Sequence, residues 1–336
     1  MKTSLVITTI NKPNNNIKLF SKNSKINKWD FIVIGDRKTP KNFSLNYGKY
    51  INLNIQKKLP FQFSKKCPEN SYARKNIGYL LAILDNSDFI VETDDDNCPK
   101  KNFFKNITLT HKVKHLKGSG WKNIYLNFLK NNEIIWPRGL PSEHIFKNPI
   151  LNSKKTKSNF YLQQGVCEGN PDVDAIYRLS NKMINIKFKK NLKYGLGKCL
   201  SPLNSQNTIW HKKIFPLLYL PVTCTMRSTD IWRGLIAQHI LSLNGFEILC
   251  FGTTMLQKRN FHNLQKDFKE EIPIYLYNNK INYILNEIKM KKGTKYFCEN
   301  LIKSYLILIK NRIISRDEMT YLNSWIKDLN KYFFYN

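Results

Sequence analysis

The sequence lacks the motifs of several common protein classes. Its seven cysteines are odd in number and widely spaced, with no Cys-X-X-Cys pair and no interleaved histidine at zinc-site spacing, which argues against a disulfide framework or a zinc cluster. It has no G-x-G-x-x-G, no P-loop lysine motif and no G-x-S-x-G elbow. Hydride transfer, P-loop NTP hydrolysis and serine hydrolysis therefore lose support.

Long apolar runs are also missing. The longest, 214–226, is too short for a membrane span and contains Pro216 and Pro221. The N-terminus has only a short apolar stretch before Asn11, which predicts a first strand rather than a signal peptide. We expect no membrane span and a soluble, cytoplasmic protein.

Acidic residues are scarce: 24 Asp and Glu stand against 55 Lys and Arg, for a formal net charge of +31. This excess favours anionic ligands. Only 9 of the basic residues are Arg, however, and 46 are Lys, whereas Arg is the usual residue for bidentate contacts to phosphates and base edges. Lys spread among many Asn and Ile is also expected from AT-rich codon usage, so the composition does not favour a nucleic-acid partner.

The first hundred residues alternate apolar runs with helical spacing. Ser4–Ile10 and Trp29–Gly35 read as buried strands, with Tyr50–Ile55 as a weaker third. Tyr72–Leu84 has helical spacing, and Phe89–Thr93 returns to a strand. This pattern predicts a βαβ-rich, nucleotide-binding α/β fold, in which the loops at 8–11, 35–38 and 94–97 converge on one edge of the sheet.

The strongest single feature is the run Asp94, Asp95 and Asp96 directly after the last of these strands. Three adjacent carboxylates repel one another, and the arrangement becomes favourable when a cation neutralises them. Hard oxygen ligands suit Mg²⁺ or Mn²⁺, which complete their shells with substrate phosphates and water. The alternative is a solvated acidic turn.

Other candidate residues have weaker signals. Arg74 and Lys75 begin the preceding helix on the same sheet edge, where they either neutralise a diphosphate or are simply solvated. Asp36 follows the second strand and either accepts a hydrogen bond from a uracil N–H or is an ordinary turn residue. Asp230 precedes a helix predicted over 231–244, so it is either the N-cap or a carboxylate facing a sugar.

The rest of the chain divides into two parts. Region 100–225 is punctuated by prolines and predicts long functional loops. After about residue 272 the sequence becomes amphipathic and predicts a helical appendage. We therefore expect a catalytic domain over 1–270 and a C-terminal helical appendage over 271–336 packed on it.

Several segments together resemble the STELLO-type glycosyltransferases of plants, which are distantly similar to the reversibly glycosylated polypeptides, or UDP-arabinopyranose mutases. The segments are weak individually but occur in the expected order over roughly residues 1–265. They are Thr8–Pro13, Val33–Pro40, Ala73–Tyr79, Glu92–Asn97, Trp136–Gly139, Gln164–Gly165, Asn170–Ala175, Asn204–Thr208 and Met226–Gly234.

The resemblance implies a GT-A fold, Rossmann-like, with a mostly parallel mixed sheet flanked by helices. It also implies a UDP-sugar donor, a carbohydrate or glycoconjugate acceptor, and Mn²⁺ or Mg²⁺ bound through Asp94 and Asp96. In this reading Thr9, Asn11 and Asp36 hold the nucleoside and Arg74 the diphosphate.

The matching segments also contribute Asp95, Asp172 and Asp174 to the expected nucleotide-sugar site. The segment around Asp230 is similar to the family's second acidic motif, and the resemblance implies that Asp230 faces the donor or acceptor as a catalytic residue. Arg138 is a loose positional analogue of the self-glycosylated arginine of the mutases, and we include it among the catalytic candidates.

His262 occupies the place where many GT-A enzymes carry a last metal ligand. The plant STELLO proteins carry a membrane anchor ahead of this domain, whereas this sequence begins at its first predicted strand, so Golgi residence is not carried over.

Three alternatives stay open from the sequence. A UDP-sugar mutase would use the same donor site and return the sugar to its own UDP. A basic polyanion-binding protein would carry the acidic triplet incidentally. A catalytically silent relative would bind nucleotide only. The donor sugar, the stereochemical course and the oligomeric state are not indicated.

Overall fold

The computed structural model describes residues 1–130, 133–181, 184–260 and 263–334. The strands are β1 (Thr3–Thr9), β2 (Asp30–Gly35), β3 (Lys49–Ile51), β4 (Phe89–Glu92), β5 (Asn97–Pro99), β6 (Thr110–His115), β7 (Ser119–Trp121), β8 (Thr156–Asn159), β9 (Leu162–Gly169), β10 (Lys193–Gly195), β11 (Lys198–Leu200), β12 (Thr208–His211) and β13 (Ile248–Gln257). The α-helices are α1 (Asn15–Asn27), α2 (Leu53–Lys58), α3 (Gln62–Lys66), α4 (Lys75–Leu84), α5 (Ile124–Phe128), α6 (Ala175–Ser180), α7 (Thr229–Leu243), α8 (Leu264–Glu287), α9 (Phe297–Lys310) and α10 (Glu318–Tyr332). Short 3₁₀ helices are η1 (Tyr72–Arg74), η2 (Ser142–His144), η3 (Lys212–Leu218) and η4 (Thr294–Tyr296).

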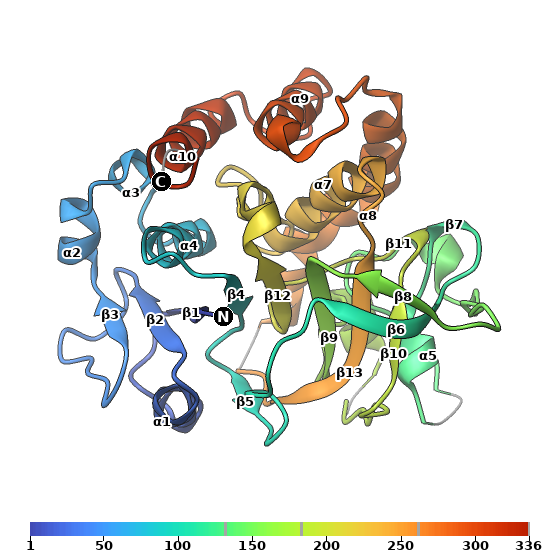
Figure 1. The fold of residues 1–336 in the computed structure, drawn as a ribbon, viewed down its shortest axis with the longest axis horizontal. Coiled ribbons are helices and arrows are strands. Elements are labelled where there is room, and N and C mark those ends of the chain that lie inside the picture. Colours follow the sequence, from blue (N-terminus) through green and yellow to red (C-terminus); the bar gives the residue numbers. More distant parts are fainter. Residues whose placement is uncertain (131–132, 182–183, 261–262, 335–336) are drawn as a thin grey trace.

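One 11-stranded mixed sheet forms the centre of the molecule, in the order β3-β2-β1-β4-β12-β9-β13-β10-β6-β8, with β5 paired to β13 (Figure 1). β3, β2, β1 and β4 are parallel. β12 is antiparallel to both β4 and β9, and β13 is parallel to β9. The carboxyl ends of β1, β2, β4, β9 and β13 therefore lie at one edge, where open α/β sheets bind ligands.

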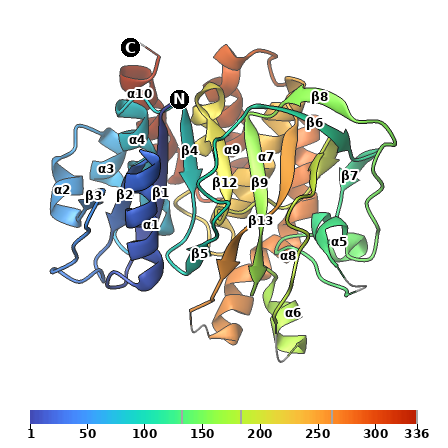
Figure 2. The same cartoon turned by 60° about the horizontal axis from the view of Figure 1, so that its bottom comes forward.

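Both faces of the N-terminal strands are buried, as their continuous apolar runs predict. Alternate side chains of β1 point to opposite faces: Leu5 and Ile7 pack in the cluster that contains Phe20 of α1, and Val6 packs in the cluster that contains Ile77 of α4. Helices thus cover both sides of the sheet, as Figure 2 shows for α1 and α4. The α/β class expected from the sequence is confirmed, and the architecture is consistent with a GT-A-like fold.

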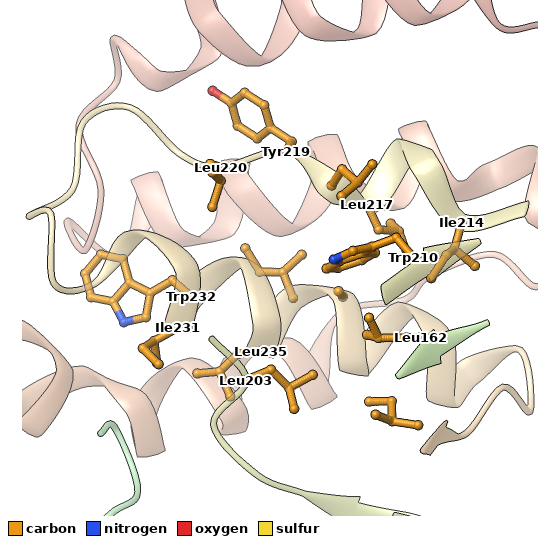
Figure 3. Close-up of a cluster of buried hydrophobic side chains, with 14 of the residues drawn as sticks. Leu162, Leu203, Trp210, Ile214, Leu217, Tyr219, Leu220, Ile231, Trp232 and Leu235 are labelled. Atoms are coloured by element: carbon orange, nitrogen blue, oxygen red, sulfur yellow. The ribbon is translucent and has the colours of Figure 1, made fainter. Parts of the chain in front are cut away.

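The largest core lies between the sheet and the helices that follow it. Trp210 of β12, Leu217 of η3 and Leu235 of α7 are each 1% exposed or less and lie in one buried cluster (Figure 3). The segment β12–η3 and helix α7, both remote in sequence from the first strands, thereby complete the core that also contains Val6 of β1.

The middle of the chain differs from the prediction of long loops. Region 100–225 contains β6 to β12, and β9 and β12 lie at the centre of the sheet. The third predicted strand is also shorter than expected: β3 ends at Ile51 because Asn52 caps α2, accepting a hydrogen bond from Ile55 N.

The C-terminal helices pack on the helices over the N-terminal strands. Asp328 of α10 accepts hydrogen bonds from Gln62 N and Phe63 N, both 2.8 Å, and so caps α3. Glu318 accepts from Thr223 N at 2.8 Å. α8 begins at Leu264 and continues through the predicted boundary at 270/271. The division into two domains stays a prediction.

Candidate functional site

The loops after β1 and β4 meet at Asp95, as the parallel pairing of these strands predicts. Thr9 Oγ1 donates to Asp95 Oδ2 at 2.6 Å, and Asn11 Nδ2 donates to the same oxygen at 2.9 Å. The loop after β2 joins them, because Thr39 Oγ1 donates to Thr9 O at 2.7 Å. The expected convergence of three loops on one sheet edge is confirmed.

Asp94 faces a buried lysine. Lys75 Nζ lies 3.1 Å from Asp94 Oδ1, and the lysine side chain is 0% exposed. Tyr72 OH donates to the same carboxylate at 2.9 Å. Burial raises the pKa of Asp94, and the charge of Lys75 acts against this rise. Lys75 is thus the basic side chain at the start of α4 that reaches the acidic triplet.

Arg74 points away from the triplet. Its Nε donates to Gln56 Oε1 at 2.8 Å, and its Nη1 donates to Cys67 O at 2.9 Å and Pro68 O at 3.1 Å. The residue is 2% exposed. Through these hydrogen bonds the guanidinium holds the segment before α4 in place. The contacts of Arg74 therefore do not support the diphosphate-binding role expected for it, which stays a prediction.

Asp36 also has partners within the protein. Its Oδ1 accepts from Asn70 N at 2.9 Å, and its Oδ2 accepts from Ser71 N at 3.0 Å. The carboxylate thereby fixes the turn that leads into η1 and α4. Its expected hydrogen bond to a uracil stays a prediction.

Asp96 carries a buried carboxylate oxygen that the surrounding side chains leave without a hydrogen bond in the described part of the chain. Gln257 Nε2 donates to its Oδ2 at 3.3 Å, while its buried Oδ1 has no hydrogen-bond partner among the described residues. Burial, followed by the charge of Asp94, raises the pKa of Asp96 to about 7. An orphaned buried carboxylate oxygen beside two other carboxylates is the arrangement that a bound cation would relieve.

The donor set fits a hard divalent ion that is shared with a ligand. Among the residues that the structure describes, no group of three or more His, Cys, Asp or Glu side chains is placed so that it could hold a metal ion. Mg²⁺ is usually held by only one or two carboxylates and otherwise by substrate phosphates and water. His262, the expected third ligand, lies outside the described residues.

Three of the sequence segments meet in a buried charge network centred on Arg138. Its Nε and Nη2 form a bidentate pair with Asp172 at 2.9 and 2.8 Å, and Nη2 also lies 3.1 Å from Asp230 Oδ2. Burial by itself lowers the pKa of Arg138. The negative charges of Asp172 and Asp230 raise it by more than burial lowers it, so the net shift of the pKa is upward. All three residues are at most 5% exposed.

This network is continuous with the acidic triplet. Asp230 Oδ2 accepts from Ser205 N at 3.2 Å and Ser205 Oγ at 3.3 Å. Ser205 Oγ in turn contacts Tyr72 OH, which donates to Asp94. Asp230 is not the N-cap of α7, because the helix begins at Thr229 with Ser228 in the N-cap position. Asp230 lies in the first turn of the helix.

The carboxylate of Asp174 accepts hydrogen bonds from neighbouring groups of the protein. It is the N-cap of α6, accepting from Tyr177 N at 2.8 Å, and its Oδ2 accepts from Trp136 Nε1 at 2.6 Å. Burial raises its pKa to about 6. A ligand contact for Asp174 stays a prediction.

Sequence reasoning missed a buried ion pair that lies next to the acidic triplet, at the end of β4. Arg233 Nη2 of α7 lies 2.7 Å from Glu92 Oε1 of β4, and Trp210 Nε1 donates to the same oxygen at 2.8 Å. A glutamate inside an apolar strand was the available signal, but nothing in the linear pattern pairs it with an arginine 141 residues away.

The chain is similar to proteins of one glycosyltransferase family. A family model described as STELLO glycosyltransferases matches residues 227–336. Two curated proteins of Arabidopsis thaliana are similar over most of the chain: "Probable glycosyltransferase STELLO1", 25% identical over 332 residues, and "Probable glycosyltransferase STELLO2", 23% identical over 336. The matches cover 91% of this chain but 42% of each relative. The expected resemblance is confirmed.

Across the described ranges of the chain, every helix is too short or too polar to cross a bilayer.

Proposed function

We propose that this STELLO-like chain is a metal-dependent glycosyltransferase that transfers a sugar from a UDP-sugar to a carbohydrate or glycoconjugate acceptor. The observation that carries the proposal is the continuity of the site. The acidic triplet connects through Tyr72 and Ser205 to the Asp230–Arg138–Asp172 network at one sheet edge. The acidic triplet, the cation site of this proposal, and a buried polar network thus lie side by side.

The order of strands supports an assignment of ligand parts to this edge. Thr9, the last residue of β1, and Asn11, which follows it, would hold the nucleoside together with Asp36 after β2. The diphosphate would lie over the triplet after β4. Lys75, whose charge already reaches Asp94, takes the neutralising role in place of Arg74.

Asp94 and Asp96 would hold Mn²⁺ or Mg²⁺. A cation bound there supplies positive charge that stabilises the departing diphosphate. The protein's own contribution is Asp96 Oδ1, to which no described residue donates a hydrogen bond, and a site whose other side chains are already fixed by hydrogen bonds.

Asp230 would act beside the sugar. Arg138 and Ser205 hold its carboxylate in one orientation, with the Arg138 charge balancing it. A fixed carboxylate next to the donor can accept a hydrogen bond from the attacking hydroxyl or stabilise positive charge that develops on the sugar ring. Arg138, enclosed by Asp172 and Asp230, acts as a positioning residue.

The test is an activity panel. Purified protein is incubated with Mn²⁺ and a set of UDP-sugars, and UDP release and sugar-ring isomerisation are both measured, with and without chelator. The proposal predicts chelator-sensitive UDP release that Asp230→Asn lowers by at least about tenfold, as loss of a positioned acid–base group usually does. The matched control, Asp317→Asn, changes an exposed carboxylate remote in the sequence from the site.

Two results would sink the proposal. One is ring isomerisation without transfer, which assigns the site to mutase chemistry. The other is UDP release that is unchanged by chelator and by Asp230→Asn.

A further inference from the structure

Arg178 is a buried cation whose hydrogen bonds, within the described part of the chain, go to neutral acceptors. It lies on α6, beyond the end of β9 (Figure 2), and is 6% exposed. Its Nη1 donates to Asn170 Oδ1 and its Nη2 to Pro171 O at 2.6 Å, both neutral acceptors, while its buried Nε finds no hydrogen-bond partner among the residues that the structure describes. No ion pair with a carboxylate is formed by Arg178 among the described residues.

Two more arginines lie close to it. Arg227 Nη2 lies 2.7 Å from Glu271 Oε1, and Arg259 Nη2 lies 2.7 Å from Asp267 Oδ2. Burial, and next the charge of Arg259, lowers the pKa of Arg178 to about 9, although Asp172 and Glu271 act against the fall. The surrounding carboxylates therefore leave the Arg178 charge incompletely compensated.

The arginines adjoin the acidic triplet. Asn170, which accepts from Arg178, donates its N–H to Gln257 O at 3.2 Å, and Gln257 Nε2 donates to Asp96. Because β9 and β13 follow β4 and β12 in the sheet, Arg178 and Arg259 lie on the side of Asp96 opposite to Thr9 and Asn11. In the proposed function this is the side beyond the nucleoside, where the diphosphate ends and the sugar begins.

A buried guanidinium is costly unless it is paired, and its planar fork matches carboxylate and phosphate oxygens. We infer that Arg178, with Arg259 and Arg227 beside it, binds an anionic oxygen group of the ligand. The group is either the donor's diphosphate or a carboxylate carried by the transferred sugar. The inference rests on the proposed function for the identity of the ligand, but not for the presence of an anion site.

The experiment compares wild-type protein with Arg178→Gln by calorimetric titration in Mn²⁺. The probes are UDP, UDP-glucose, UDP-glucuronate and inorganic pyrophosphate. Arg316→Gln, at an exposed arginine, is the matched control. Arg178→Lys keeps the charge but not the fork, and it replaces Arg178→Gln if that variant does not give a cooperative thermal transition.

Loss of a charged hydrogen-bonding partner should lower the affinity for the affected probe by at least about tenfold. A loss shared by UDP, UDP-glucose and pyrophosphate supports the inference and identifies the diphosphate. A loss confined to UDP-glucuronate supports it and identifies a sugar carboxylate. Unchanged affinity for all four probes in a folded variant overturns it.

Failure of the proposed function gives a different pattern. In that case the wild-type protein binds none of the three uridine nucleotides. Pyrophosphate and free glucuronate then test the anion site alone: weaker binding of either by Arg178→Gln supports the site, and no difference from wild type refutes it.

Discussion

Lys75 Nζ lies 3.1 Å from Asp94 Oδ1, whereas the neighbouring Arg74 is turned to Gln56 and the backbone of Cys67 and Pro68. Two consecutive basic residues thus have separate tasks: one faces the acidic triplet and the other holds the chain that leads into α4. This difference yields a paired prediction.

Lys75→Met should weaken Mn²⁺-dependent UDP binding by about tenfold, because it removes a charge from the diphosphate side of the site. Arg74→Met should instead lower the free energy of unfolding, since Gln56 and two carbonyls lose buried donors, while the folded protein keeps its UDP affinity. Titration calorimetry and urea denaturation on both variants check this. Equal loss of UDP affinity in the two variants contradicts the separation of tasks.

The buried Glu92–Arg233 pair should contribute to stability only as a pair. Arg233→Met leaves the Glu92 charge, which is 0% exposed, without its cation. The expected cost is about 3–5 kcal/mol in the free energy of unfolding. The double variant Glu92→Gln with Arg233→Met should recover part of that loss in urea denaturation. A double variant less stable than the single one would mean that the carboxylate does not depend on its partner.

His239 should make stability fall in mild acid. Burial lowers its pKa to about 4, and its Nε2 lies 3.1 Å from Asn282 Oδ1. Between pH 6.5 and pH 4 the unfolded chain binds a proton that the folded chain does not, so the free energy of unfolding decreases as pH falls. The shift corresponds to at most about 3 kcal/mol.

The His239→Gln variant isolates this contribution from the other titrating groups. It keeps a polar side chain opposite Asn282 and cannot take up the proton. The difference in unfolding free energy between wild type and variant should therefore change between pH 7 and pH 4.5. A constant difference over that range contradicts the assignment.

The parts of the fold that could be predicted are those with a strong local pattern. The apolar runs of β1, β2 and β4, and the apolar spacing of α7, predict their elements because burial on both faces or along one stripe demands those residues. The meeting of Thr9 with Asp95 then follows from parallel pairing alone.

The centre of the sheet could not be predicted in this way. β9 carries Gln163, Gln164 and Gly165 in its buried part. Gln163 donates to Thr108 O at 2.8 Å, and Gln164 accepts from Thr208 Oγ1 at 3.1 Å. Polar residues whose hydrogen-bond partners lie far away in the sequence look like loop residues in a linear pattern, so the sequence predicts loops in this region.

The same limit applies within the site. The triplet and the segments around Arg138, Asp172 and Asp230 were found from the sequence, but their joining through one guanidinium depends on tertiary distances. Which of Arg74 and Lys75 faces the triplet depends on Gln56, a buried residue with no sequence signal.

The most direct test of the central claim is Mn²⁺-dependent UDP binding by the double variant Asp94→Asn with Asp96→Asn, measured by titration calorimetry beside wild type and Asp317→Asn. The two substitutions keep side-chain volume and remove the charges proposed to hold the cation. Wild type and control should bind UDP only with Mn²⁺, and the double variant should keep its thermal transition but lose that binding. Undiminished Mn²⁺-dependent binding in the double variant would contradict the account.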